Sequence, residues 1–218
     1  MHTIRAVIFD FDGTFAPQTN RLHFLSFRTA FRKFGYDMQE SDLVDLFGVP
    51  QDQIIRTLLP TADDKTVKRI SDFKMREYMK LISKESIPHE NVRTIEALKK
   101  RGFKVAISSG SYLGPVKRMV PMHLIDDIVT AEDIHRPKPD PEILLKTAKD
   151  MRIRPDQCAY VGDSWRDKGA ADAAEMLFIG VLADLTSKGL LASNPEMLVG
   201  SIPELLKLFV KAPQEVAI

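Results

Sequence analysis

The sequence has little cysteine, little net charge and no long apolar run. Its single cysteine, Cys158, excludes an intramolecular disulfide and lies in an apolar segment, so we expect a reduced, cytoplasmic protein. The 31 Lys plus Arg balance 30 Asp plus Glu, so no overall field favours nucleic acid or an anionic membrane. No apolar run approaches the ~18 residues of a transmembrane helix, and no signal-peptide pattern precedes the first expected strand. We therefore expect no nucleic-acid partner and no membrane contact, whereas the oligomeric state, monomer or homodimer, stays open.

Short apolar runs rich in Val, Ile and Phe recur along the chain. They read "RAVIFD", "FKVAISS", "DDIVTA", "CAYVGD" and "LFIGVL", and each is bounded by Gly, Asp or Ser. Helical patterns separate most of them, and 44% of the 218 residues are hydrophobic, which suffices for a substantial core. Strands that alternate with helices predict parallel pairing through right-handed crossovers. The expected fold is therefore α/β, a Rossmann-like doubly wound parallel sheet with helices on both faces.

The interval 16–88 interrupts this alternation, because it contains no convincing strand. Phenylalanines recur at spacings of three and four from Phe24 to Phe34, and large apolar side chains do the same from Met75 to Ile82. We therefore predict an all-helical module of about four helices at 16–88, inserted into an α/β core domain made of 1–15 and 89–218. The aromatic stripe is expected to form the core of the module, not a ligand site.

Four polar clusters follow apolar runs at the points where strands are expected to end. They are "DFDGT" at Asp10–Thr14, "SSGS" at Ser108–Ser111, "RPKPDPE" at Arg136–Glu142 and "GDSWRD" at Gly162–Asp167. Each cluster alone also fits an ordinary turn or a helix cap. In an open α/β sheet, however, ligands bind beyond the carboxyl ends of the strands. The coincidence of all four therefore predicts one ligand site.

The chemistry of these clusters is complementary. Asp10, Asp12 and Asp163 would concentrate negative charge, which is unfavourable unless a cation neutralises it, and a small set of oxygen ligands suits Mg²⁺ better than Ca²⁺. A second set can donate hydrogen bonds to a phosphoryl group: the Ser109 hydroxyl, the Gly110 amide and the Lys138 ammonium. Acids, a metal and phosphate donors together describe a phosphoryl-transfer site.

The four motifs, in this order and at these separations, resemble those of the haloacid dehalogenase superfamily. The resemblance is to its phosphatase-type members with a C1 helical cap, the phosphoglycolate phosphatase-like and beta-phosphoglucomutase-like subfamily, and the interval 16–88 lies where that cap is inserted. It implies an enzyme, a Mg²⁺-dependent phosphatase that hydrolyses a small phosphorylated metabolite. The acid at Asp12 favours phosphate chemistry, because the dehalogenases of the superfamily lack an acid there.

The resemblance also implies roles for the first motif. Asp10 would be the nucleophile that forms an aspartyl-phosphate, and it would also ligate Mg²⁺. Asp12 would be the general acid and then the general base, while its backbone carbonyl ligates the metal. Gly13 would allow a sharp turn, and Thr14 would hold that turn and contribute to the phosphate site.

The other motifs receive roles in the same way. Ser109 and the Gly110 amide would bind the phosphoryl oxygens, and Lys138 would bridge Asp10 and the phosphoryl group. Asp163 would ligate Mg²⁺ directly, and Asp167 would hold a metal-bound water or orient Lys138.

Several assignments have alternatives. Ser108 and Ser111 are neighbours that could replace Ser109 in the motif, and Arg136 could replace Lys138. His23 could be a substrate contact or a packed helix residue. Trp165 could face the substrate or pack at the junction of core and cap, the latter being expected.

The function also has alternatives within this fold and outside it. A phosphomutase would use the same nucleophile, but Gln51 stands roughly where the mutases of the superfamily have a basic residue, which disfavours this interpretation. A phosphonatase would need a cap lysine that forms a Schiff base, for which Lys65, Lys68 and Lys80 are candidates by position. A receiver-like phospho-accepting signalling domain also gathers acids around Mg²⁺, but such domains lack a long helical insertion.

Overall fold

The computed structural model describes residues 3–183 and 185–212 of the chain. A six-stranded, wholly parallel sheet in the order β3-β2-β1-β4-β5-β6 forms its centre. The strands are β1 (Ala6–Phe9), β2 (Lys104–Ser108), β3 (Asp127–Val129), β4 (Cys158–Gly162), β5 (Leu177–Val181) and β6 (Leu198–Val199). The α/β class is therefore confirmed, and each of the five apolar runs contains a strand. The short edge strand β6 was not predicted, since two residues give no measurable periodicity.

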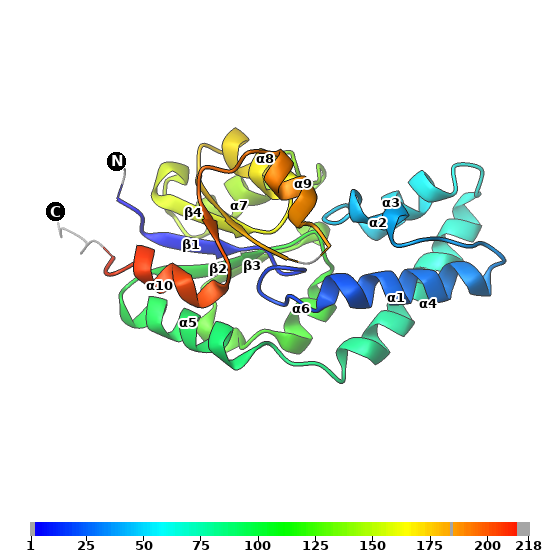
Figure 1. Cartoon of the computed structure of the whole chain (residues 1–218), viewed down its shortest axis with the longest axis horizontal. Coiled ribbons are helices and arrows are strands. Elements are labelled where there is room, and N and C mark those ends of the chain that lie inside the picture. Colours follow the sequence, from blue (N-terminus) through cyan, green and yellow to red (C-terminus); the bar gives the residue numbers. More distant parts are fainter. Residues whose placement is uncertain (1–2, 184, 213–218) are drawn as a thin grey trace.

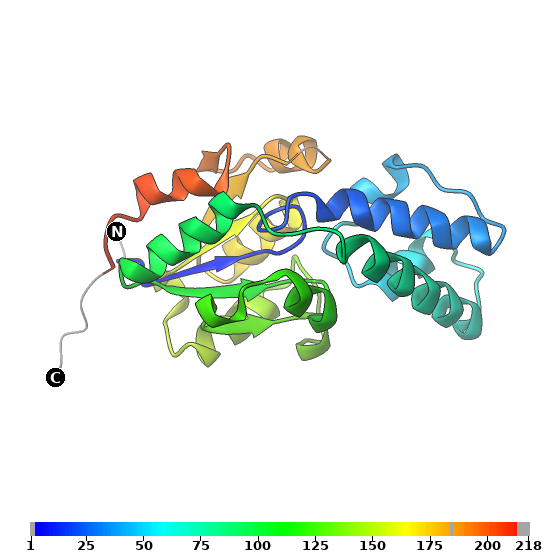
Figure 2. The same cartoon turned by 90° about the horizontal axis from the view of Figure 1, so that it is seen from below.

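Helices cover both faces of the sheet (Figures 1 and 2). The α-helices of the described residues are α1 (Thr19–Lys33), α2 (Ser41–Val44), α3 (Gln51–Leu58), α4 (Asp64–Ile82), α5 (His89–Lys100), α6 (Leu113–Met119), α7 (Glu142–Asp150), α8 (Trp165–Ala173), α9 (Ser187–Ala192) and α10 (Leu205–Leu208). Four 3-10 helices add η1 (Met122–Leu124), η2 (Ala131–Asp133), η3 (Pro155–Gln157) and η4 (Ile202–Glu204).

The alternation of side chains along the central strand explains the two hydrophobic layers. Val7 and Phe9 point to the face covered by α5, α6 and α10, whereas Ala6 and Ile8 point to the face covered by α7, α8 and α9. Successive side chains of a strand point to opposite faces, so a strand buried on both sides must be apolar at every position. This requirement explains why β1 reads "AVIF" without a polar residue and is buried throughout.

The strand order places a switch point beside β1. The chain moves from β1 to β2 and β3 on one side, then returns to β4, β5 and β6 on the other. At such a point the connections leave in opposite directions, which opens a crevice at the carboxyl ends of the strands. The sequence after β1, which begins at Asp10, therefore enters the crevice.

Helices α1 to α4 come between β1 and α5 in the sequence. In space they extend beyond one end of the sheet (Figure 1). The long helices α1 and α4 pack against each other, and the aromatic stripe of α1, with Phe24, Phe27 and Phe31, is buried in a cluster separate from the two clusters on the sheet. These helices have the all-helical character predicted for 16–88. We propose that this interval is a cap domain and that 1–15 and 89–218 form the core domain. No helix among the described residues combines the length and apolar character that crossing a membrane requires.

Candidate active site

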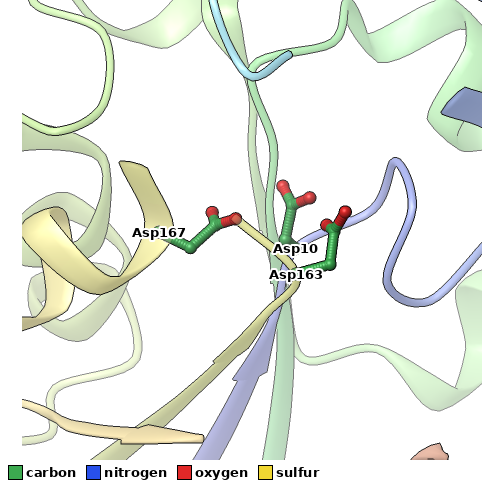
Figure 3. A group of neighbouring side chains, drawn as sticks. All are labelled: Asp10, Asp163 and Asp167. Carbon is green, nitrogen blue, oxygen red and sulfur yellow. The ribbon is translucent and has the colours of Figure 1, made fainter. Parts of the chain in front are cut away.

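The predicted carboxylates gather at the carboxyl ends of two neighbouring strands. Asp10 follows β1, Asp163 follows β4, and Asp167 lies in the first turn of α8. All three are buried, and one oxygen of each lies within 4.8 Å of the others. Figure 3 shows Asp10 and Asp163 side by side, with Asp167 pointing toward them from its helix. The structure therefore brings together Asp10, Asp163 and Asp167 from separate parts of the sequence, whereas the Asp12 side chain, expected beside Asp10 and Asp163, is not in this group.

Lys138 is the cation of the cluster and is only 2% exposed. Its Nζ donates to Asp10 Oδ1 at 2.7 Å, to Asp167 Oδ1 at 2.6 Å and to the Tyr160 hydroxyl at 2.9 Å. Burial alone would lower the pKa of Lys138, but the two carboxylates hold this pKa well above its usual value. Arg136, the alternative in this motif, is exposed and pairs with Asp140 and Glu142. Lys138 thus supplies a permanent positive charge beside Asp10.

Burial and the neighbouring carboxylates both raise the pKa values of Asp10 and Asp163. Burial raises the pKa of Asp10 well above its usual value, despite the attraction of Lys138. Burial, with Asp167 nearby, raises the pKa of Asp163 to about 7. Carboxylates that are costly to ionise together are stabilised by a cation among them, so Asp10 and Asp163 fit a divalent metal with hard oxygen ligands.

Asp167 belongs to the same cluster, but its oxygens already have partners. Oδ1 accepts from Lys138 and from the Tyr160 hydroxyl at 2.8 Å, and Oδ2 accepts from the Ser164 amide at 3.1 Å. Ser164 and Asp167 form a capping box at the start of α8. Of the two expected roles for Asp167, the geometry favours orienting Lys138.

Asp163 is held in place by side chains from three other segments. Thr14 Oγ1 donates to Asp163 Oδ1 at 2.8 Å, Asn20 Nδ2 donates to Oδ2 at 3.1 Å, and the Thr186 hydroxyl also donates to Oδ2. Thr14 was predicted as a phosphate ligand, and this prediction needs correction for its side chain. A threonine hydroxyl has one hydrogen, and that hydrogen is committed to Asp163. Gly13 adopts φ +77°, and a Cβ there would lie 2.4 Å from Asp163 Oδ2.

The serines after β2 have three different environments. Ser108 is paired with Thr147 of α7 at 2.6 Å inside the core, so it is not available to a ligand. Ser109 Oγ accepts from the Ser111 amide at 3.0 Å, and an acceptor hydroxyl retains its hydrogen for an incoming anion. The Ser111 hydroxyl donates to Asp12 Oδ2. These environments favour Ser109, with the adjacent Gly110 amide, as the phosphate-binding pair.

Asp12 faces a different direction from the other acids. Its side chain is not part of the cluster in Figure 3, and its Oδ1 lies 3.0 Å from His23 Nε2 and 3.2 Å from the Tyr78 hydroxyl. A metal role for Asp12 can thus involve only its backbone carbonyl, and this role stays a prediction. The carboxylate instead faces the helical insertion.

His23 connects Asp12 to a buried lysine that the sequence analysis missed. Lys74 Nζ lies 2.8 Å from His23 Nδ1, and His23 stacks on Tyr78 with ring centroids 4.1 Å apart. A lysine ammonium can only donate, so Nδ1 accepts and the imidazole presents Nε2–H to Asp12. The only sequence signal was a charged residue on the apolar face of a predicted helix, four positions from Ile70 and from Tyr78.

The pKa values in this chain of contacts follow from burial and neighbours. Burial lowers the pKa of Lys74 to about 7, against a smaller opposing effect of Asp12. Burial and the nearby Lys74 lower the pKa of His23. Burial alone would raise the pKa of Asp12. The nearby His23 and the hydrogen bonds that the Asp12 carboxylate accepts lower this pKa overall. By contrast Lys65, Lys68 and Lys80, the cap lysines considered from sequence, are exposed.

The helical insertion closes over the site. A cavity of about 40 Å³ lies between the two parts and is lined by Asp12 and Gly110, which follow strands of the sheet, and by His23 and Lys74 of the helical insertion. The loop between α2 and α3 approaches so closely that a Cβ at Gly110 would lie 2.6 Å from the Gly48 carbonyl oxygen.

An arginine from the last motif spans the same junction. Arg166 donates to the Asp45 carbonyl of the insertion at 3.1 and 3.3 Å and to the Lys138 carbonyl of the core at 3.4 Å. The Arg166 guanidinium carbon lies 4.4 Å from the centroid of the Trp165 ring, and the packing of Trp165 at the junction stays a prediction.

Comparison with known proteins adds a family to this geometry. The family model described as "Haloacid dehalogenase-like hydrolase" matches residues 7–181. The chain is 29% identical over 194 residues to beta-phosphoglucomutase of Bacillus subtilis, covering 82% of this chain and 83% of that protein. It is 25% identical over 213 residues to pyrophosphatase PpaX of Bacillus velezensis, covering 94% and 96%.

Solved structures share the whole architecture. Beta-phosphoglucomutase from Clostridium difficile superimposes with a TM-score of 0.84 at 23% identity, covering 95% of both chains. CbbY from Rhodobacter sphaeroides, in complex with xylulose-(1,5)bisphosphate, gives 0.83 at 20% identity, covering 93% of this chain and 96% of that one. These two likenesses concern the fold. The family model covers most of the chain, including the ends of β1, β2 and β4, and the protein therefore belongs to the haloacid dehalogenase-like hydrolases, a family of enzymes.

Proposed function

We propose that this protein is a Mg²⁺-dependent phosphatase that hydrolyses a small phosphorylated metabolite through an aspartyl-phosphate on Asp10. The observation that carries the proposal is the buried ion pair between Asp10 Oδ1 and Lys138 Nζ, 2.7 Å apart at the end of β1. A carboxylate can attack an anionic phosphate only where positive charge offsets the repulsion. Lys138 has that charge, and its two carboxylate partners prevent its loss.

The metal would lie against Asp10 and Asp163, with the Asp12 carbonyl as a further ligand by family resemblance. When bound, Mg²⁺ supplies additional positive charge for the transferring phosphoryl group. The buried acids fit this role because their pKa values are raised in its absence. Asp167 would act through Lys138, which it holds toward Asp10.

In the first step, an Asp10 oxygen would form a bond to phosphorus while the bond from phosphorus to the leaving oxygen breaks. The Ser109 hydroxyl and the Gly110 amide would hold the phosphoryl oxygens. Asp12, on the cap side of the site, would give its proton to the leaving oxygen. The incoming phosphate brings negative charge beside Asp12, which raises the pKa of this acid toward a value at which it can carry a proton.

In the second step, water would attack phosphorus and Asp12 would take the proton from that water. The bond between Asp10 and phosphorus then breaks, and free phosphate and the Asp10 carboxylate are restored. The lowered pKa of Asp12 in the unliganded site favours its role as a base. His23 and Lys74 would fix the direction in which its carboxylate points, and the closed cap would exclude bulk water.

A phosphomutase is the second candidate, because the Bacillus subtilis relative with 29% identity has that name. Both activities would begin with the same aspartyl-phosphate, so they differ only in whether water or the substrate receives the phosphoryl group. Net release of phosphate from phosphomonoesters would support the phosphatase. An isomerised sugar phosphate with no net phosphate release would support the mutase.

The test is phosphate release from p-nitrophenyl phosphate and from a metabolite panel, with and without Mg²⁺. The Asp10→Asn variant should lose at least about 10³-fold in kcat/KM, because an amide is no nucleophile toward phosphorus. The circular dichroism spectrum of this variant should match that of the parent, and its unfolding should stay cooperative. Loss of activity can then be distinguished from loss of the fold. Mg²⁺-dependent phosphate release that persists in Asp10→Asn would contradict the proposal.

A further inference from the structure

The leaving group of the substrate must lie on the side of the site that Asp12 faces. Asp12 would protonate the leaving oxygen, and it lines the cavity between core and cap. This cavity continues into an open groove of about 500 Å³ between the cap and the core. The two spaces share four lining residues, which are Gln51, Met75, Tyr112 and Pro115. Gln51 therefore borders both the cavity and the groove.

Gln51, the first residue of α3, is only 8% exposed and has one unused polar atom. Its Nε2 donates to the Ser71 carbonyl at 3.1 Å and to the Ser71 hydroxyl at 2.6 Å. A carbonyl can only accept, so this contact defines which end of the amide is the nitrogen. Gln51 Oε1 is buried and has no hydrogen-bond partner among the described residues. A buried acceptor in this state is stabilised by a ligand that donates a hydrogen.

Each cation that lines the cavity or the groove already has a partner. Arg56 pairs with Asp64 at 2.7 Å, and Lys68 pairs with Asp72 at 3.4 Å. Lys74 Nζ lies 2.8 Å from His23 Nδ1 and over the rings of Phe27 and Tyr78. The groove contains a third acid, Asp52, so its charged lining groups are three acids and two bases. A second phosphate or a carboxylate on the substrate would face net negative charge here, which disfavours its binding.

Much of the remaining cavity wall is apolar, beside the hydroxyl groups of Tyr78, Ser111 and Tyr112. Its apolar residues include Phe47, Val49, Ile54, Met75 and Pro115. Such walls suit a small carbon skeleton, and the acceptor Gln51 Oε1, unpartnered among the described residues, suits a hydroxyl group on that skeleton.

We propose that the substrate is a phosphomonoester of a small uncharged alcohol, and that a further hydroxyl of this alcohol donates to Gln51 Oε1. This inference rests on the proposed phosphatase activity and makes Gln51 a specificity-determining residue. Esters that contain a second anionic group on the leaving side would be poor substrates.

Steady-state kinetics of the full-length enzyme with four substrates test the proposal. These are glycerol phosphate, propyl phosphate, phosphoglycerate and inorganic pyrophosphate. We expect kcat/KM for glycerol phosphate to exceed that for each of the others at least about tenfold, because a site built to receive a hydroxyl rejects analogues that lack it or add charge. Equal or faster turnover of phosphoglycerate or pyrophosphate would overturn the proposal, whatever the behaviour of any variant.

A matched pair of variants then tests Gln51 itself. Gln51→Leu should lower the ratio of kcat/KM for glycerol phosphate over propyl phosphate about tenfold, because it removes the acceptor and keeps the volume. Gln53→Leu, the same change on an exposed face of α3, should leave this ratio within about twofold. A Gln51→Leu ratio equal to that of the parent would overturn the role of Gln51.

Gln51→Lys should shift specificity in the opposite direction. It adds a cation to the cavity, so the ratio of kcat/KM for phosphoglycerate over glycerol phosphate should rise at least about tenfold. An unchanged ratio would count against the charge argument. Failure of the phosphatase proposal and failure of this inference can be distinguished. If the phosphatase proposal fails, p-nitrophenyl phosphate turnover survives in Asp10→Asn. If only this inference fails, Asp10→Asn abolishes that turnover, but glycerol phosphate is not the preferred substrate of the parent enzyme.

Discussion

Two lysines are buried on opposite sides of the same site, and their neighbours give them opposite acid–base behaviour. Lys138 of the core is 2% exposed and contacts two carboxylates, which raise its pKa well above the usual value. Lys74 of the cap is 1% exposed and contacts an imidazole and the faces of Phe27 and Tyr78, and burial lowers its pKa to about 7. Equal burial thus does not determine charge; the partners inside the buried environment do.

The difference matches the two roles we propose. In the proposed reaction, Lys138 must stay protonated beside the phosphoryl group, and its contacts with Asp10 and Asp167 keep it protonated. The cap needs a group that directs an imidazole toward Asp12, and aromatic faces stabilise an ammonium less strongly than carboxylates do. Lys74 therefore loses its positive charge near neutral pH, because its pKa is about 7.

The largest expected effect is the removal of the core lysine. Lys138→Met should lower kcat/KM at least about 10³-fold and destabilise the protein by about 3–5 kcal/mol, because Asp10 and Asp167 are left as unpaired buried carboxylates. Phosphate release and urea unfolding measure the two effects. Lys146→Met, which removes a lysine in a partly exposed pair with Asp150, should change stability by less than about 1 kcal/mol. A stable, active Lys138→Met enzyme would remove the basis of the comparison.

Removal of the cap lysine should separate activity from stability. Lys74→Met should lower kcat/KM about 10–100-fold, because His23 is no longer held with Nε2–H toward Asp12. The same change should raise the free energy of unfolding at pH 7 by about 2–4 kcal/mol, since it replaces a buried ammonium of depressed pKa by an apolar side chain. Urea unfolding at pH 7 is the measurement, and a loss of stability as large as that of Lys138→Met would show that the two lysines are equivalent.

The pH dependence of stability should differ for the two lysines in sign and range. The folded pKa of Lys74 lies near 7 and its unfolded pKa near 10.5, so its cost is present in full below pH 7 and disappears as pH rises to 10.5. The folded pKa of Lys138 is raised, so its contribution is complete below pH 10.5 and is lost only as pH rises through the folded value.

Unfolding of the parent and of Lys74→Met between pH 7.5 and 9.5 tests this difference. The stability advantage of Lys74→Met should shrink by about 1.4 kcal/mol per pH unit. The difference between two proteins cancels the titration of groups that they share. A constant difference over this range would mean that Lys74 is either always charged or always neutral.

The smallest effect concerns the junction of the two regions. Arg166→Ala removes hydrogen bonds to the Asp45 and Lys138 carbonyls, so the closed cap should be weakened and KM should rise about fivefold with kcat within about threefold. Lys168→Ala, on the same helix but paired only with Asp172, is the control and should leave KM unchanged. A lowered kcat with unchanged KM would place Arg166 in the chemistry of Lys138 instead.

Much of the core could be predicted from sequence because its signals are local. The run "AVIF" is apolar at every position, which only a strand buried on both faces requires. The acids Asp10 and Asp163 follow such runs directly, so the parallel sheet brings them together at one edge. The contact between Lys74 and His23 in the helical insertion could not be predicted from a local sequence pattern. Lys74 and His23 are 51 positions apart, and only the packing of α4 on α1 joins them.

The hydroxyl-bearing residues show the same limit. Ser108, Ser109 and Ser111 cannot be distinguished from sequence, but the path of the chain after β2 pairs Ser108 with Thr147, leaves Ser109 Oγ as an acceptor for the Ser111 amide and directs the Ser111 hydroxyl to Asp12. Thr14 looked like a phosphate ligand because it follows the nucleophile motif, yet its hydroxyl is used by Asp163, which is 149 positions away. A hydroxyl can serve either partner, so geometry alone decides.

The sequence by itself determined the doubly wound sheet, the inserted helices and the order of the acidic and basic groups, because periodicity and strand-end position are properties of neighbouring residues. Only the tertiary structure decided which of those groups are charged and where each points. Lys138 and Lys74 have the same side chain, but one is folded against carboxylates and the other against rings. Electrostatic energy depends on the distance and burial of partners that are remote in sequence, and these become defined only when the chain has folded.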